Sequence, residues 1–145
     1  MRIKKMFAVL SATAIMITLS AVPALASVTD STLPTRFIAY TAYANTDTRT
    51  KDNDTSVYMN NTSGMTLWVY TNGGTAPSGT TGIDVGTTIG GYANVNPGEY
   101  KIRNYIQEYG YTTAFCNIST ATNGVGGTLS GKWSPDSVGN FPNAN

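Results

Sequence analysis

Apolar and polar residues alternate along several short segments of this chain, which is the pattern of half-buried β-strands. The clearest segment is 66–71 (Thr-Leu-Trp-Val-Tyr-Thr), bounded on its far side by an Asn-Gly-Gly turn. Its alternation places Leu67 and Val69 on one face and Trp68 and Tyr70 on the other. We therefore expect one face of this strand to lie against a core.

The same signals recur along the rest of the chain, with turn residues at intervals of roughly 8 to 12 residues. The predicted strands besides 66–71 are 37–43, 56–59, 88–95, 99–104, 111–119 and 128–133. Segment 105–109 also fits a short helical stripe, but its flanking glycines favour one irregular turn or a continued strand. Residues 27–36 are expected to form a loose arm, 45–55 a loop, and the residues from 134 onward a tail.

The composition agrees with a β-rich fold. Thr, Asn, Ser and Gly make up 58 of the 119 residues that follow residue 26, and nine tyrosines are present. Thr and Tyr favour pleated, half-buried surfaces, whereas Gly and Asn favour tight turns. The predicted fold class is all-β, a single-domain antiparallel β-sandwich with a small β-barrel as the alternative.

The first 26 residues have the three-part plan of a secretory signal peptide. Arg2, Lys4 and Lys5 precede an uncharged apolar segment at 6–19, which should be helical, and residues 24–26 (Ala-Leu-Ala) supply a cleavage site. A transmembrane anchor needs about 20 apolar residues, more than this segment offers. We expect cleavage after residue 26, with residues 27–145 secreted as one extracellular β-domain that contains no transmembrane segment.

The charge that remains after cleavage is small. Six basic and eight acidic residues follow residue 26, a net charge of −2 with no basic cluster. Nucleic-acid binding usually requires a clustered basic surface. We therefore expect no nucleic-acid partner, and the partner should be an extracellular or cell-surface molecule that the sequence does not identify.

Histidine is absent, which excludes Ser-His-Asp and Cys-His catalysis and imidazole metal ligands. Cys116 is the only cysteine, so it cannot form an intrachain disulfide. It should be buried on one strand face with Ala114 and Ile118 rather than act as a nucleophile. No cofactor is expected.

The acidic residues leave two weaker alternatives. A pair of carboxylates suffices for glycoside hydrolysis, and the candidates are Glu99, Glu108, Asp84 and Asp136. Calcium prefers clustered oxygen ligands, and the weak candidates for such a site are Asp47, Asp52 and Asp54 beside Asn53. Solvated surface acids are the favoured interpretation of both sets, so no metal site and no catalytic residue is predicted.

The aromatic residues are the candidates for a binding surface, because Tyr and Trp offer large contact area at low entropic cost. The candidate binding residues are Tyr105, Tyr109, Tyr111, Trp133 and Asp136. The alternative is that aromatic side chains fill the core, and we expect Trp133 and Trp68 in the core or at its edge.

Residues 134–137 (Ser-Pro-Asp-Ser) are predicted to form a type I turn that closes the last strand. In such a turn the Asp136 carboxylate would accept a hydrogen bond from a nearby backbone N–H. Glu99 or Glu108 facing Asp136 across a cleft would instead favour a hydrolase.

Two segments, 104–111 (Asn-Tyr-Ile-Gln-Glu-Tyr-Gly-Tyr) and 131–137 (Gly-Lys-Trp-Ser-Pro-Asp-Ser), carry a resemblance that covers roughly residues 55–138. They resemble small secreted β-proteins of Gram-positive bacteria, of uncharacterised function. More distantly, residues 130–133 (Ser-Gly-Lys-Trp) resemble a late strand of lactococcin-type bacteriocins, which are compact β-sandwiches. Those bacteriocins usually carry histidine, and this chain has none.

These observations favour a secreted, non-enzymatic binding or interaction protein. The resemblance implies the alternative of a bacteriocin-like antibacterial protein, and an extracellular carboxylate-based hydrolase is less favoured.

Overall fold

The computed structural model describes residues 29–75 and 87–145, and these contain strands and turns but no helix. The strands are β1 (Ser31–Thr32), β2 (Phe37–Ala39), β3 (Ala44–Asn45), β4 (Arg49–Thr50), β5 (Val57–Asn61), β6 (Leu67–Gly73), β7 (Ala93–Val95), β8 (Gly98–Ile102), β9 (Thr113–Thr120), β10 (Gly126–Thr128) and β11 (Gly131–Ser134). The fold class is all-β, as the sequence predicts.

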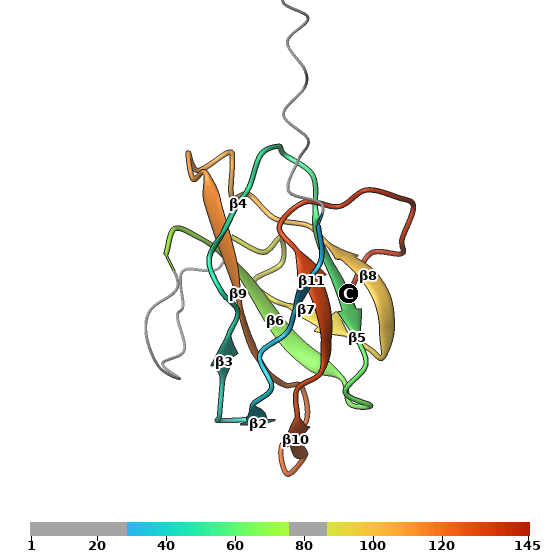
Figure 1. Ribbon diagram of the computed structural model, residues 1–145. Coiled ribbons are helices and arrows are strands. Elements are labelled where there is room, and N and C mark those ends of the chain that lie inside the picture. The colour runs from blue at the N-terminus through green and yellow to red at the C-terminus, as the bar shows by residue number, and fades with distance from the viewer. Residues whose placement is uncertain (1–28, 76–86) are drawn as a thin grey trace, which may run out of the picture.

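The strands form two larger sheets and one small ribbon, and every strand pair is antiparallel. The first sheet has the order β1-β11-β5-β8. The second has the order β3-β9-β6-β7. Strand β4 also pairs with β9, on the same edge as β3 but farther along it. Strands β2 and β10 form the ribbon at one end of the molecule (Figure 1). Within the described residues no sheet closes on itself, so the alternative of a β-barrel is wrong.

One hydrophobic core joins the two larger sheets. Val57 and Met59 of β5 belong to the same buried cluster as Leu67 and Val69 of β6, and each has no exposed surface. Burial of a Val, Leu or Met side chain contributes roughly 1.5–3 kcal/mol. Two sheets packed over a shared core are the arrangement of the predicted β-sandwich.

The predicted strand 37–43 is wrong beyond Ala39. Ala39 and Ala42 exchange both backbone hydrogen bonds, at 3.0 and 3.1 Å, so the chain turns at Tyr40 and Thr41. The chain then continues as β3, which pairs with β9 instead of β10. Local alternation cannot reveal this change of partner, because both halves have strand-like composition.

The predicted strand 128–133 is also divided. Leu129 and Ser130 separate β10 from β11. Gly131, the first residue of β11, has a φ of +137°, a conformation that glycine adopts readily. A side chain at this position would meet the carbonyl oxygen of Asn60 at 2.0 Å. The late Gly-x-Trp segment therefore begins a new strand in a different sheet.

Three segments predicted as irregular are tied to the sheets. In the expected arm, β1 pairs with β11 and Leu33 is buried. The expected loop 45–55 contains β4, which extends the edge beside β9. The expected tail lies alongside β8. There the backbone N–H of Lys101 donates to the Pro142 carbonyl, and the backbone carbonyl of Lys101 accepts from the Ala144 N–H, both at 2.8 Å. Each of these segments depends on a partner far away in sequence.

Segment 105–109 forms the irregular turn that its glycine flank favours. The Tyr111 N–H donates to the Ile106 carbonyl at 3.0 Å, and the Gly110 N–H donates to the Gln107 carbonyl at 2.8 Å. With Gly110 at a φ of +82°, these bonds make the Schellman arrangement that ends helical turns.

Of the predicted strand 88–95, only residues 93–95 are a strand. Thr88 forms an isolated bridge with Asn104 instead.

The predicted signal peptide (1–26), its helical segment and the candidate Asp84 lie outside the described residues. Among the described residues, no helix reaches the length and apolar character needed to span a bilayer.

Candidate binding site

The three candidate tyrosines lie at the turn that follows β8. Tyr105, Tyr109 and Tyr111 are 41%, 64% and 40% exposed, so Tyr109 is the most exposed of them. The rings of Tyr105 and Tyr109 contact each other, with centroids 5.8 Å apart and planes tilted by 39°. The Tyr111 ring instead packs directly on the backbone of Gly73 in β6. The contact is so close that a Cβ added to Gly73 would lie 2.2 Å from the ring. Tyr111 therefore has a packing role, and the accessible aromatic surface here is Tyr105 and Tyr109.

Trp133 is fully buried in the core, where β11 faces the second sheet. The expectation that it belongs to the core is confirmed, and a fully buried indole has no surface to offer a partner. Trp68 lies on the outward face of β6, since Leu67 and Val69 on either side of it are buried. The core does not include Trp68.

Asp136 is also buried, and it forms an ion pair with Lys51 at 3.0 Å. Its other carboxylate oxygen accepts a hydrogen bond from the backbone N–H of Asp52 at 3.0 Å. The predicted backbone donor exists, but it comes from the loop after β4. In place of a hydrogen-bonded turn at 134–137, residues 135–136 form a bend, and the Ser137 N–H donates to Thr55 Oγ1 at 3.1 Å. Two charges buried without partners would be strongly unfavourable, so the ion pair is best explained as structural.

The remaining predicted candidates are not brought together. The described residues hold no group of three or more acidic or cysteine side chains placed to bind a metal ion, which leaves the weak calcium site at Asp47, Asp52 and Asp54 without support. Glu108 is exposed on the turn after β8, and Cys116 is fully buried on the face predicted for it. Burial raises the pKa of the Cys116 thiol, which keeps it protonated and unreactive.

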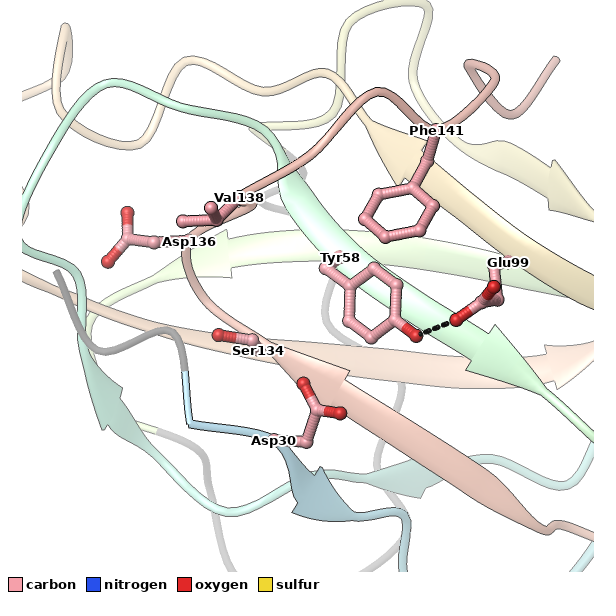
Figure 2. Close-up of a pocket in the computed structure, with 7 residues that line it drawn as sticks. All are labelled: Asp30, Tyr58, Glu99, Ser134, Asp136, Val138 and Phe141. Carbon is pink, nitrogen blue, oxygen red and sulfur yellow. Dashed lines mark hydrogen bonds between the residues drawn. The ribbon is translucent and has the colours of Figure 1, made fainter.

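A cavity of about 300 Å³ opens on the outer face of the first sheet (Figure 2). The residues that line it are Asp30, Tyr58, Glu99, Ser134, Asp136, Val138 and Phe141. Strand alternation places Tyr58 on this face, because Val57 and Met59 point into the core. The docked C-terminal segment brings Phe141 over the Tyr58 ring, with centroids 4.9 Å apart.

Two carboxyl groups line the cavity around Tyr58. The Tyr58 hydroxyl donates to Glu99 Oε1 at 2.6 Å, and the Asp30 carboxyl lies below the Tyr58 ring in Figure 2. The Asp136 carboxyl points away from the cavity (Figure 2), toward its partner Lys51. Asp136 therefore does not face Glu99 across the cavity, as a hydrolase using this pair would require.

The surroundings of Tyr58 raise the pKa of its hydroxyl. Burial contributes most, followed by the hydrogen bond to Glu99 and the negative charges of Glu99 and Asp30. The phenol therefore stays protonated and serves as a donor that fixes one carboxylate in place. No described lysine or arginine lines the cavity or makes an ion pair with Asp30 or Glu99.

Of the seven residues that line the cavity, the sequence analysis named only Glu99 and Asp136 as candidates. Asp30 falls in the segment interpreted as a loose arm, and Phe141 falls in the expected tail. Tyr58 sits in a predicted strand without any sign that its outward face would be covered. Regular β-alternation would assign Tyr58 to the outer face, but only the docked termini make a cavity there.

The described residues thus define an antiparallel all-β protein with an acidic, partly aromatic cavity on one outer face. Residues 20–137 match the model of the family described as "Protein of unknown function (DUF2712)", and the chain belongs to this family. Searches of curated proteins and of solved structures give no significant match. The resemblance to bacteriocins stays a prediction.

Proposed function

We propose that this protein is exported and acts as a non-enzymatic binding protein, whose cavity receives a cationic group of an extracellular or cell-surface partner. The observation that carries this proposal is that Asp30 and Glu99 line the same cavity, where the Tyr58 hydroxyl fixes the Glu99 carboxylate. Two carboxylates in one concave site attract an ammonium or guanidinium group.

The aromatic rings add to this preference. The faces of Tyr58 and Phe141 carry partial negative charge, and a cation held near such a face gains roughly 0.5–2 kcal/mol. Lys101 and Lys132 belong to the same sheet, yet neither lines the cavity. A cation from a partner would supply the positive charge that the cavity's own lining lacks.

Binding is favoured over catalysis by the state of the polar groups. Glu99 accepts a hydrogen bond from a phenol with a raised pKa, which holds its carboxylate as a fixed acceptor. A general base works best with a pKa near neutrality and free access to the proton that it removes. The sequence offers no histidine for that role.

The binding proposal is tested by NMR titration of the protein with three short peptides, Gly-Lys-Gly, Gly-Arg-Gly and Gly-Gln-Gly. We expect the two cationic peptides to shift the signals of Tyr58 and Phe141, and added salt to weaken the effect. Asp30→Asn and Glu99→Gln should each reduce affinity by about fivefold or more. Glu108→Gln, which removes an exposed acid outside the cavity, is the matched control. Equal binding of the neutral peptide, or an equal loss in the control, would refute the proposal.

Export is tested separately by mass spectrometry of the culture medium of a producing Gram-positive host. We expect a species that begins at Ser27. Retention of the full-length chain inside the cell would contradict the exported role, whatever the peptides bind.

A further inference from the structure

The two large sheets have outer faces of opposite character. On the first sheet, the positions around Tyr58 include Lys101, Glu99 and Lys132, which are charged. The outward positions of β6 and β9 in the second sheet are instead all uncharged: Trp68, Tyr70, Asn72, Thr113, Phe115, Asn117 and Ser119. The neighbouring strands add Asn94, opposite Trp68, and Asn45, opposite Asn117. We call this side of the second sheet the uncharged face. Its half-buried positions are Trp68, Tyr70 and Thr113, whereas Asn72, Phe115, Asn117 and Ser119 are buried.

A continuous row of aromatic rings lies on the uncharged face. The Trp68 ring contacts Tyr40 on one side, at 5.2 Å between centroids, and Tyr92 on the other, at 4.9 Å. Tyr92 also contacts Tyr70 at 6.0 Å. Tyr92 is 39% exposed and the other three are half-buried, so the row is partly open to solvent. Neighbouring rings are tilted by 44° to 55° rather than coplanar.

Polar atoms without partners gather on the same face. Asn72 Oδ1, Asn117 Oδ1 and Ser119 Oγ are buried and make no hydrogen bond. They account for three of the five such side-chain atoms in the described part of the chain. Strand register places Asn117 opposite Tyr70 and Ser119 opposite Trp68, directly beside the aromatic row. A buried acceptor without a donor costs about 1–3 kcal/mol. A ligand that shifts the side chains around these atoms and brings donors to them would remove this cost.

We propose that the uncharged face binds an uncharged glycan chain. The apolar C–H faces of sugar rings stack on aromatic side chains, and sugar hydroxyls donate to amide and hydroxyl oxygens. The contiguous rings of Tyr40, Trp68 and Tyr92 form a track for consecutive sugar units. Asn94 stands beside Trp68 as an exchangeable donor and acceptor.

The absence of charge on this face decides between ligand classes. An anionic polymer or a cationic peptide would find no opposite charge at any outward position of β6 or β9. A neutral, hydroxyl-rich chain satisfies both the rings and the acceptors. This inference does not depend on the cavity at Tyr58, which lies on the other sheet.

The test is a fluorescence titration of the full-length protein with soluble hexamers of β-1,4-linked glucose and of β-1,4-linked N-acetylglucosamine. Trp68 should respond to the sugar, while the fully buried Trp133 supplies a constant background. We expect saturable binding of at least one hexamer, unchanged by added salt. Trp68→Ala should weaken it by at least about tenfold. Because Trp68→Ala removes a half-buried ring, Tyr92→Ala serves as a second variant at a more exposed position, and thermal melts verify that both are folded.

Tyr109→Ala is the matched control, since it removes an even more exposed aromatic ring from a different part of the surface. Loss of binding confined to the Trp68 and Tyr92 variants supports the proposal. Absence of binding to both hexamers, or an equal loss in the Tyr109 variant, overturns it. A concentration-dependent dimer that Tyr92→Ala dissociates would also overturn it, because the face would then be an interface between copies.

Discussion

Lys51 and Asp136 form a fully buried ion pair of 3.0 Å, although 85 residues separate them along the chain. The Lys51 ammonium also donates to the carbonyl oxygens of Thr55, at 2.5 Å, and Pro135, at 2.8 Å. All three of its protons therefore have acceptors. Burial lowers the pKa of Lys51, and the hydrogen bond and charge of Asp136 oppose that shift. The pair fastens the loop after β4 to the segment that follows β11.

Removal of one member of this pair should strongly destabilise the protein. Lys51→Met leaves the Asp136 carboxylate buried without its cation, and Asp136→Asn leaves the ammonium without its anion. We expect each variant to lose about 3–5 kcal/mol in the free energy of unfolding, measured by urea denaturation.

The double variant tests whether the two losses share one cause. Lys51→Met combined with Asp136→Asn should cost clearly less than the sum of the two single variants, because neither charge is then left alone. Additive losses would show that the two side chains act independently.

Gly131 should tolerate no side chain. Gly131→Ala forces a positive φ on alanine and places its Cβ 2.0 Å from the backbone oxygen of Asn60. We expect a loss of more than about 2 kcal/mol in the free energy of unfolding. Gly64→Ala is the control, because Gly64 also has a positive φ, +74°, but open space around its Cα. The control should lose only about 1–2 kcal/mol, and an equal loss at both sites would contradict the steric explanation.

The contact between Gly73 and Tyr111 offers a second steric test. Gly73 does not have a positive φ, so the cost of Gly73→Ala should come from collision of the new methyl group with the Tyr111 ring. We expect Gly73→Ala to lower the melting temperature in the wild-type background and to have a much smaller effect in the Tyr111→Ala background. The same loss in both backgrounds would place the cause elsewhere.

Cys116 should resist alkylation in the folded protein. Its raised thiol pKa should also make the free energy of unfolding fall at high pH. Burial raises the thiol pKa in the folded state, whereas the unfolded thiol ionises near pH 8.5. Below about pH 8.5 the thiol is protonated in both states, so the free energy of unfolding does not depend on its ionisation there and is at its full value. Above that value the unfolded chain loses a proton that the folded chain keeps, and stability falls by up to about 1.4 kcal/mol per pH unit.

Urea denaturation at pH 7.5 and 9.5 measures this effect, together with the rate of iodoacetamide labelling. Cys116→Ala is the control for other groups that titrate in the same range. The same pH dependence in this variant would exclude the thiol as its source.

Local residue patterns were sufficient to predict the β-class of this protein and several of its faces. The alternation in 66–71 assigned Leu67 and Val69 to the core correctly, and both are fully buried. The burial of Cys116 with Ala114 and Ile118 followed from the same period of two. The irregular turn at 105–109 is one of the two alternatives, besides a continued strand, that the flanking glycines favour, and the positive φ of Gly110 ends that turn. These features are local, because neighbouring residues and backbone geometry determine them.

Pairings between distant segments were decided only by the tertiary structure. Asp136 was predicted as a turn residue because no local signal connects it with Lys51. The cavity requires Asp30 from one end of the described chain and Phe141 from the other to meet beside Tyr58. The uncharged face likewise depends on register, since Asn94, Trp68 and Ser119 become neighbours only when β7, β6 and β9 pair. A sequence carries the period of each strand, but strand order and register arise from the packing of the whole core, and the candidate sites depend on both.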